Sequence, residues 1–334
     1  MSTLVATYKK LVSHSIWKDK LFINFIKLVL FLAFVYFIYY QITRRDNIEA
    51  IKTAFLARLE SGNIIYLIIT CLLIPVNWSL EAIKWQYLTK PIQKMGWKGS
   101  LLGVLSGVTL SLFTPARIGE FGGRLINIKA ANRGKVLIAN IIGSYSQLVI
   151  IISLGIVSLS LYLTYQIGLK PLFSNLIIGG GIFICFILII IYFNIGLIIR
   201  VLQKFKVPSK LISILSVMSR YSHSRLLKIL CLSFSRYFVY TTQAVLIYLF
   251  FGIDTKLIEY YVNISIGFLS QTFIPIPTFL DLPVRGGLSI WIWDYLDIDA
   301  LTLSSIPFIL WLLNICMPAS LGMILISIYD RSKS

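Results

Sequence analysis

Residues 114–124 read Thr-Pro-Ala-Arg-Ile-Gly-Glu-Phe-Gly-Gly-Arg and follow a short apolar run at 101–113. A helix that crosses a bilayer needs about 20 apolar residues, because each adds about 1.5 Å against a hydrocarbon core of about 30 Å. The run is too short to cross, so we expect it to enter the membrane and turn back. Thr114 is placed to cap the returning helix, with Pro115 as its first residue. Because broken helices at membrane depth are tolerated only where they face protein or water, this stretch predicts a cavity.

The composition is that of an all-α membrane protein. Of the 334 residues, 57% are hydrophobic and only 13% are charged, and the apolar residues form long runs. An average soluble domain has about 25% charged residues. We therefore predict a polytopic bundle of membrane helices that leaves almost no room for a separate soluble domain.

The net charge is +18, from 31 Lys and Arg against 13 Asp and Glu. The bases lie mainly at the ends of apolar runs, where cytoplasmic flanks and anionic lipid headgroups explain them, so we expect no nucleic-acid partner. The four cysteines fall inside apolar runs without a Cys-x-x-Cys pattern, and we expect them to be inert core residues. Both histidines, His14 and His223, lie far from any acidic cluster, so neither a metal nor a cofactor is expected.

About six full spans and two re-entrant hairpins are expected. The short apolar runs at 101–113 and 260–273 are predicted to form the hairpins, since each ends close to a proline. Residues 43–63 carry apolar side chains at three- and four-residue spacing, which predicts a helix in the interface plane. The full spans are predicted at about 21–42, 63–85, 136–164, 172–199, 229–251 and 301–328.

The orientation follows from the basic residues. Seven bases and no acid lie between Arg200 and Lys228, which places this loop in the cytoplasm under the positive-inside rule. Both termini then lie on the cytoplasmic side of the cell (inner) membrane. The bases of segment 44–58 would lie outside, and the acidic residues of that segment offset them only in part.

The two halves of the chain resemble each other. Gly107 and Gly267 occupy matching places in the two short runs, 160 residues apart, and a slip of one residue aligns Glu120-x-x-x-Arg124 with Asp281-x-x-x-Arg285. With the first hairpin entering from the cytoplasm and the second from outside, the halves would be inverted copies, as in alternating-access transporters. The predicted parts are an N-terminal basic segment with first span and interfacial helix (1–62), membrane repeat 1 (63–165), a connecting span with the basic loop (166–225) and membrane repeat 2 (226–334).

Two patterns carry a family resemblance: Asn-Trp-x-x-Glu-Ala-x-x-Trp at 77–85 and Pro-x-Arg-x-Gly-Glu-x-x-x-Arg at 115–124. With them the chain resembles the lysylphosphatidylglycerol synthase transmembrane-region family, also called flippase-like, which includes the membrane half of the multiple peptide resistance factor. The resemblance covers about 63–328 and implies translocation of a lipid. No counterpart of that protein's soluble aminoacyl-transferase half is found in the sequence, so synthesis of lysyl-lipid is not expected.

The second half departs from the family pattern. Where the resemblance implies a glycine-rich turn followed by Arg-Glu, this chain has Asp281-Leu282-Pro283 and then Arg285-Gly286. The role of the missing glutamate is therefore either lost or moved to Asp281. Asp281 has a purely structural alternative, because Thr278-x-x-Asp281 also fits a capping box at the start of the second returning arm.

Charged side chains at membrane depth are costly, and their default interpretation is functional. Arg117 lies in the first turn after the proline, where free amides favour an anion and where its planar fork suits a phosphate. Glu120 and Arg124, at i and i+4, either contact the substrate or only neutralise each other. Glu81 and Lys84 share one helix face, either as an interfacial ion pair between tryptophan anchors or as part of the transport site. The predicted substrate-binding residues are Arg117, Glu120, Arg124, Asp281 and Arg285, with Asn77, Glu81 and Arg236 as secondary candidates.

These features predict a lipid translocase that works by alternating access on a membrane phospholipid or a polyprenyl-phosphate lipid. The alternative is a membrane-embedded accessory subunit of, or an enzyme for, modification of lipids or lipid-linked glycans. We do not expect an enzyme, because the sequence has no His-Glu-x-x-His, Gly-x-Ser-x-Gly or paired-aspartate pattern and so no catalytic residues are assigned. A homo-oligomer or a separate lipid-modifying enzyme remains open as a protein partner.

Overall fold

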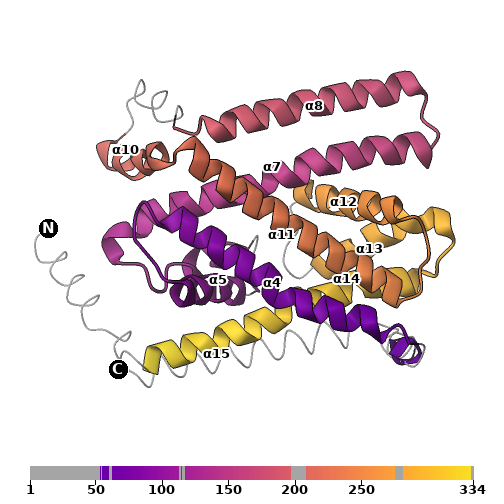
Figure 1. Ribbon diagram of the computed structural model, residues 1–334, viewed down its shortest axis with the longest axis horizontal. Coiled ribbons are helices and arrows are strands. Elements are labelled where there is room, and N and C mark those ends of the chain that lie inside the picture. The colour runs from indigo at the N-terminus through magenta and orange to yellow at the C-terminus, as the bar shows by residue number, and fades with distance from the viewer. Residues whose placement is uncertain are drawn as a thin grey trace, which may run out of the picture. The chain divides into compact units, whose positions relative to one another are not determined.

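A computed structural model describes residues 53, 55–59, 62–112, 114, 117–196, 208–274 and 281–331. The chain forms two compact units, Met1–Glu49 and Ala50–Ser334, and all the described residues belong to the second. Every regular element among them is helical, which confirms the all-α class. The elements are α4 (Ile64–Thr89), α5 (Trp97–Leu112), α6 (Gly119–Gly123), α7 (Arg133–Tyr165), α8 (Pro171–Phe193), α10 (Ser209–Leu215), α11 (His223–Phe250), α12 (Leu257–Phe273), α13 (Asp281–Trp293), α14 (Ala300–Trp311) and α15 (Met317–Arg331) (Figure 1).

Four of the described helices are long and apolar enough to cross a membrane: Ile64–Thr89, Ala130–Tyr165, Leu172–Phe193 and Ala300–Tyr329. The predicted span at 229–251 forms most of α11, which is 28 residues long but is not one of these four. The predicted span at 21–42 lies outside the described residues, as does most of the predicted interfacial helix at 43–63, of which residues 53 and 55–59 are helical.

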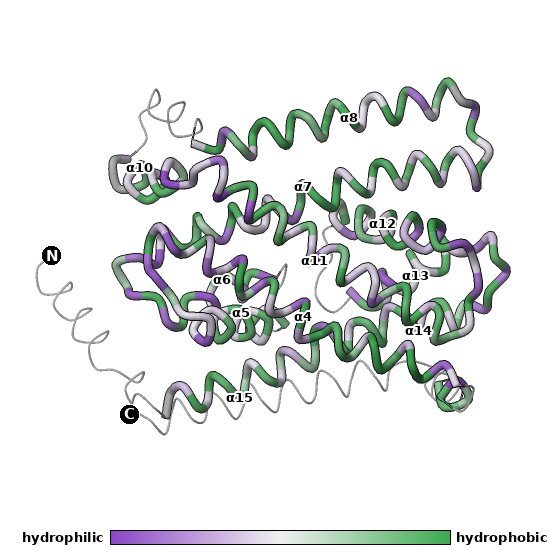
Figure 2. Tube along the Cα trace, viewed as in Figure 1, coloured by the Kyte–Doolittle hydropathy of each residue, from purple (hydrophilic) through white to green (hydrophobic). Residues whose placement is uncertain are grey.

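Apolar side chains cover much of the outside of these helices. Figure 2 shows α8 as hydrophobic along most of its length, and several of its large side chains, such as Leu176 and Phe183, are more than half exposed. Cys71 and Cys231 are exposed as well, so the expectation that all four cysteines lie in the core is wrong, although Cys316 is buried. In a membrane helix the lipid-facing surface is also apolar, and an apolar run therefore does not separate core from outside.

The two short apolar runs form α5 and α12, of 16 and 17 residues, and after each the chain turns back. α4 and α11 pack against each other, α5 packs against α15, and α12 packs against α7. Each short helix therefore contacts the closing helix of the other half. The loops that flank the α5–α6 hairpin and those that flank α12–α13 lie at opposite ends of the described helices (Figure 1).

The returning arm of the first hairpin begins later than predicted. α6 starts at Gly119, with Ile118 at the N-cap position, and Pro115 lies outside the described residues. The Thr114 hydroxyl does accept a hydrogen bond from the Gly119 amide at 2.6 Å. Arg117, however, has a left-handed φ of 57°, which interrupts any helical path between these two residues. Thr114 therefore accepts a hydrogen bond from the first residue of α6 without being the N-cap residue of that helix.

Glycines allow α6 to lie directly on the backbone of α5. A Cβ at Gly119 would collide with the carbonyl group of Leu110, and one at Gly123 would collide with the carbonyl oxygen of Ser106. On the facing side, a Cβ at Gly107 would lie 3.1 Å from the carbonyl oxygen of Glu120. This backbone contact determines where α6 lies along α5, and therefore where the charged side chains of α6 are placed.

We expect Gly123→Ala to destabilise the protein, because α6 must move away from α5 to admit the methyl group. Overpacking of this kind costs about 1–3 kcal/mol. The matched control is Gly122→Ala, since no atom lies within 4 Å of a Cβ built at Gly122. Unfolding of the purified variants in detergent measures the difference. Equal stability of the two variants would show that α5 and α6 do not touch through their backbones.

Candidate functional site

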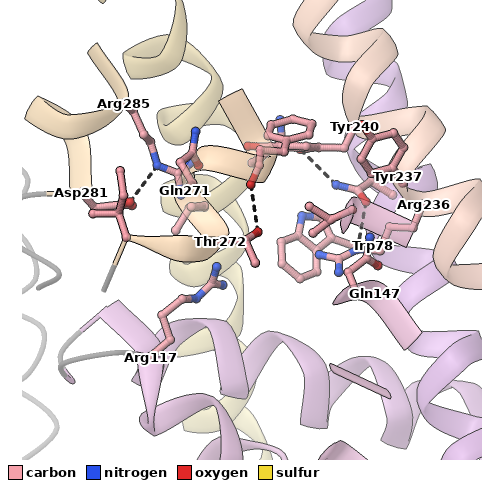
Figure 3. Close-up of a pocket in the computed structure, with 16 residues that line it drawn as sticks. Trp78, Arg117, Gln147, Arg236, Tyr237, Tyr240, Gln271, Thr272, Asp281 and Arg285 are labelled. Carbon is pink, nitrogen blue, oxygen red and sulfur yellow. Dashed lines mark hydrogen bonds and ion pairs between the residues drawn. The ribbon is translucent and has the colours of Figure 1, made fainter. Parts of the chain in front are cut away.

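A cavity of about 660 Å³ lies among α4, α7, α11, α12, α13 and the turn between α14 and α15 (Figure 3). Its charged wall residues are Arg117, Arg236, Asp281 and Arg285. Arg285 Nε donates a hydrogen bond to Asp281 Oδ1 at 2.8 Å, so these two side chains neutralise each other within α13. Aromatic side chains supply much of the remaining wall: Trp78, Tyr237, Tyr240 and Phe268.

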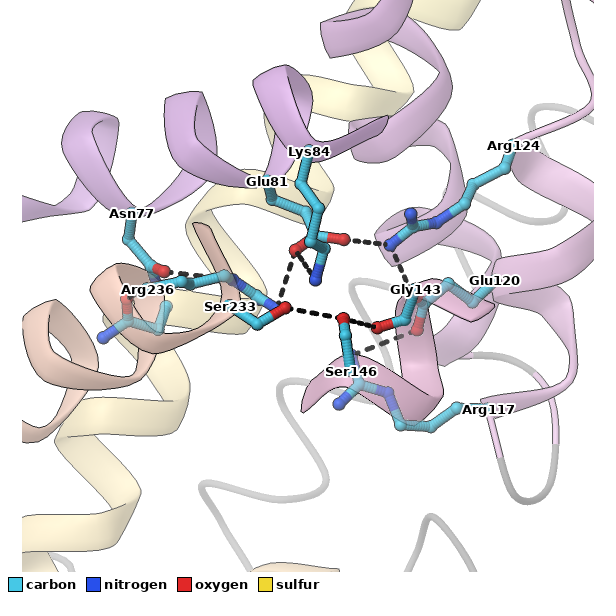
Figure 4. Close-up of polar contacts among 11 residues, drawn as sticks. Asn77, Glu81, Lys84, Arg117, Glu120, Arg124, Gly143, Ser146, Ser233 and Arg236 are labelled. Carbon is cyan, nitrogen blue, oxygen red and sulfur yellow. Dashed lines mark hydrogen bonds and ion pairs between the residues drawn. The ribbon is translucent and has the colours of Figure 1, made fainter. Parts of the chain in front are cut away.

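A buried carboxylate lies behind this wall. Glu81, in the C-terminal half of α4, is 2% exposed, and its Oε2 is 2.7 Å from Lys84 Nζ and 3.0 Å from Arg236 Nη1. Its Oε1 accepts a hydrogen bond from Arg124 Nη2 at 2.8 Å (Figure 4). Lys84 lies on the same helix, Arg124 at the end of α6 and Arg236 on α11. One carboxylate therefore joins the first helix of each half to the first hairpin.

Two tryptophans hold the guanidinium groups in place. Arg124 lies 5.0 Å from the centre of the Trp85 ring, and Arg236 lies 5.3 Å from the centre of the Trp78 ring. Residues three and four apart on a helix share a face, so both tryptophans flank Glu81 on α4. Each pair adds a cation–π attraction, which is stronger where water is excluded. The Asn-Trp-x-x-Glu-Ala-x-x-Trp pattern is thus one face of α4 built to hold two arginines.

The α6 carboxylate completes the cluster. Arg124 Nη2 also donates to Glu120 Oε1 at 2.5 Å, as its i, i+4 spacing predicts, and Glu120 Oε2 lies 3.8 Å from Arg117 Nη2. Lys84, Arg124, Glu81 and Glu120 form a neutral group of two cations and two carboxylates. The other two cations of this network, Arg117 and Arg236, both line the cavity, with side chains 50% and 25% exposed. The excess positive charge of the network therefore faces the cavity.

The structure brings the predicted residues together in two layers. Asn77, Arg117, Arg236, Asp281 and Arg285 line the cavity, and behind them lie the buried Glu81 and Arg124 with the partly exposed Glu120, whose side chain is 24% exposed.

The interfacial interpretation of the Glu81–Lys84 pair is wrong, because the two side chains are only 2% and 3% exposed. The same residue types at the same spacing fit either a membrane interface or a buried site. Only the position of Arg124 and Arg236 beside them separates these two possibilities.

Three amides of the cavity wall were not predicted: Gln147, Gln271 and Asn314. Asn314 lies in a π-helical turn, Leu312–Cys316, which joins α14 to α15. Its Oδ1 accepts a hydrogen bond from Asn77 Nδ2 at 3.3 Å, and its own Nδ2 has no hydrogen-bond partner within the described part of the chain. The signal was present in the sequence, because Asn314 is a strongly polar residue within an apolar span.

The fold and the site define a class. Apolar helices long enough to cross a membrane, interrupted helices beside a cavity and a buried charged network are the features of a helical membrane protein with a cavity lined by charged residues.

This chain belongs to the lysylphosphatidylglycerol synthase transmembrane-region family, whose model matches residues 24–288, more than half of the sequence. The match confirms the resemblance noted from the motifs, and together with the apolar helices it is consistent with a function that involves membrane lipids. Comparison with curated proteins and with solved structures finds no match.

We expect Arg117→Gly to be more stable than Arg117→Ala by about 1 kcal/mol, because a left-handed conformation is costly for every residue that carries a Cβ. Both variants lack the guanidinium group, so their difference isolates the backbone strain at φ 57°. Thermal unfolding in detergent measures it. If alanine were as stable as glycine here, residue 117 would not be held in a left-handed conformation.

Proposed function

We propose that this protein is a flippase-like lipid translocase that moves a phosphate-bearing lipid or lipid-linked precursor between the two leaflets by alternating access. The observation that carries the proposal is the charge at the cavity: the ion-pair network has four cations against two carboxylates, and two of those cations, Arg117 and Arg236, line the cavity. Positive charge in a low-dielectric site attracts an anion, and the headgroup phosphate is the common anion of membrane lipids.

The wall of the cavity suits such a headgroup. Guanidinium groups bind phosphate oxygens in a fixed, often bidentate geometry. The cavity has two such groups from this network: Arg117, just before α6, and Arg236, on α11. A volume of about 660 Å³ lies within the usual range for small-molecule sites. The acyl chains of the lipid remain outside the cavity, among the apolar helices.

The packing of the two halves supports inverted repeats. Each short helix contacts the closing helix of the other half, and both returning arms carry an i, i+4 ion pair, Glu120–Arg124 and Asp281–Arg285. We propose that repeat 1 (63–165) and repeat 2 (226–334) are inverted copies on either side of the connecting segment (166–225). The site at their interface is then reached from each side in turn.

In this arrangement Asp281 takes the place of the missing second glutamate. It neutralises Arg285 in the second half as Glu120 neutralises Arg124 in the first. The pair then contributes hydrogen bonds to the cavity wall without adding net charge, and capture of the phosphate depends on Arg117 and Arg236. The protein lies in the cell (inner) membrane with about six full spans and both termini in the cytoplasm.

The decisive experiment is transport in proteoliposomes, with fluorescent lipids whose outer-leaflet copies are quenched chemically. We expect the protein to move a labelled phosphatidic acid or phosphatidylglycerol between leaflets, and to leave a labelled diacylglycerol at the protein-free rate of exchange. A protein that bound or moved the lipids without regard to the phosphate would contradict the proposal.

Arg117→Ala should weaken binding of a short-chain phosphatidic acid by about 1.5–3 kcal/mol, the range for a hydrogen bond to a charged group. Arg117→Lys should recover only part of this loss, because a point charge does not reproduce the planar fork. Titration of the purified protein in detergent measures the affinity. Arg133→Ala is the matched control, since Arg133 is exposed at the start of α7, away from the cavity. Equal affinity of Arg117→Ala and wild type would remove Arg117 from the site.

Opposite entry of the two hairpins predicts opposite labelling. In a variant without its native cysteines, single cysteines at Lys98 and Ala131 should react with an impermeant maleimide only from the cytoplasm, and those at Asp254 and Asp297 only from outside. All four positions are exposed: Lys98 is at the start of α5, Ala131 is in the short 3-10 turn before α7, and Asp254 and Asp297 are in the loops that flank α12–α13. Labelling after solubilisation controls for reactivity. Reaction of all four from one side would exclude inverted repeats.

A further inference from the structure

Arg236 has two possible anionic partners. Its Nη1 lies 3.0 Å from Glu81 Oε2, and its Nε donates to Asn77 Oδ1 at 3.2 Å, so it is held on α4. It also lines the cavity, where its side chain is 25% exposed. A phosphate in the cavity therefore competes with Glu81 for the same guanidinium group.

Arg124 is not available for such an exchange. Its side chain is only 5% exposed, it is bonded to both Glu81 and Glu120, and it stacks on Trp85. If Arg124 turned to a headgroup, two carboxylates would each lose a close cation, whereas departure of Arg236 affects Glu81 alone.

Lys84 keeps Glu81 paired after Arg236 has left it. Its Nζ is 2.7 Å from the Oε2 atom of Glu81 that Arg236 contacts, and the side chain is buried and does not line the cavity. When Arg236 leaves, Glu81 keeps Lys84 on one oxygen and Arg124 on the other. Together with Glu120 these residues form the neutral group described above, so no buried charge is stranded, which is otherwise a large penalty.

Resting on the proposed function, we infer that Arg236 exchanges Glu81 for the headgroup phosphate and that Lys84 is the positioning residue that permits this exchange by keeping Glu81 paired. Binding then opens an ion pair between α4 and α11, the first helices of the two halves. Release of the lipid lets Glu81 recapture Arg236 and close it. When no headgroup is present, the Glu81 carboxylate takes the place of the phosphate as the anionic partner of Arg236.

The inference predicts a reversal between two variants. In Lys84→Met, Glu81 has lost one of its three cations and retains Arg236 more strongly, so binding of short-chain phosphatidic acid should weaken on the order of tenfold, the scale of one charged hydrogen bond. In Glu81→Gln/Lys84→Met the buried group stays neutral in sum and nothing competes for Arg236. Its affinity should equal or exceed that of wild type, while transport in proteoliposomes is lost because the α4–α11 ion pair cannot re-form.

Lys94→Met is the matched control, because it removes an exposed lysine and should change neither binding nor transport. A merely structural Lys84 would leave the affinity of the folded single variant unchanged, or would leave the double variant as weak as the single one. Either result overturns the inference. If Lys84→Met does not yield folded protein, the double variant decides alone: affinity at or above wild type with lost transport supports the exchange, and weakened affinity or retained transport overturns it. If instead wild type does not prefer lipids with a phosphate, the proposed function itself fails.

Discussion

The carboxylate of Glu81 is 2% exposed in α4, a helix long and apolar enough to cross a membrane, and an unpaired charge buried in this way would be severely penalised. Its three cationic partners come from α4 itself, from the end of α6 and from α11. The positions of the first hairpin and of the second half are therefore both tied to this one side chain. Arg124 also lies over the ring of Trp85, and Arg236 over the ring of Trp78. The position of each guanidinium group is therefore restricted by a ring as well as by a carboxylate.

Arg124 can reach Glu81 only because α6 lies on the backbone of α5. The glycines at 119 and 123 make that close approach possible. Arg117, with its left-handed backbone, lies two residues before α6 begins. The same short segment thus supplies one buried arginine and one that faces the cavity. Backbone features that would be unfavourable in an ordinary helix are concentrated where the charged side chains are placed, which is the expected association of local strain with a functional site.

Charge is divided unequally across the site. The group of Glu81, Lys84, Glu120 and Arg124 is neutral in sum, and so is the Asp281–Arg285 pair. The two remaining cations of the network, Arg117 and Arg236, face the cavity from opposite halves. An anion that contacts both Arg117 and Arg236 would bridge the two halves. Without such an anion, Arg236 stays paired with Glu81. In the function that we propose, this division connects recognition of a phosphate to the contact between α4 and α11.

The sequence by itself determined the all-α membrane class, the two short helices, the family and the local pairs, because apolar run length and helical spacing depend only on neighbouring residues. It also marked every charged wall residue of the cavity as a candidate. It did not separate an interfacial Glu81–Lys84 pair from a buried one, it expected cysteines in the core that face outward, and it began the returning helix too early. Only the tertiary structure decided that Arg124 and Arg236 share Glu81 and that Asn314 joins the cavity, since these contacts link residues far apart in the chain and depend on how helix faces pack.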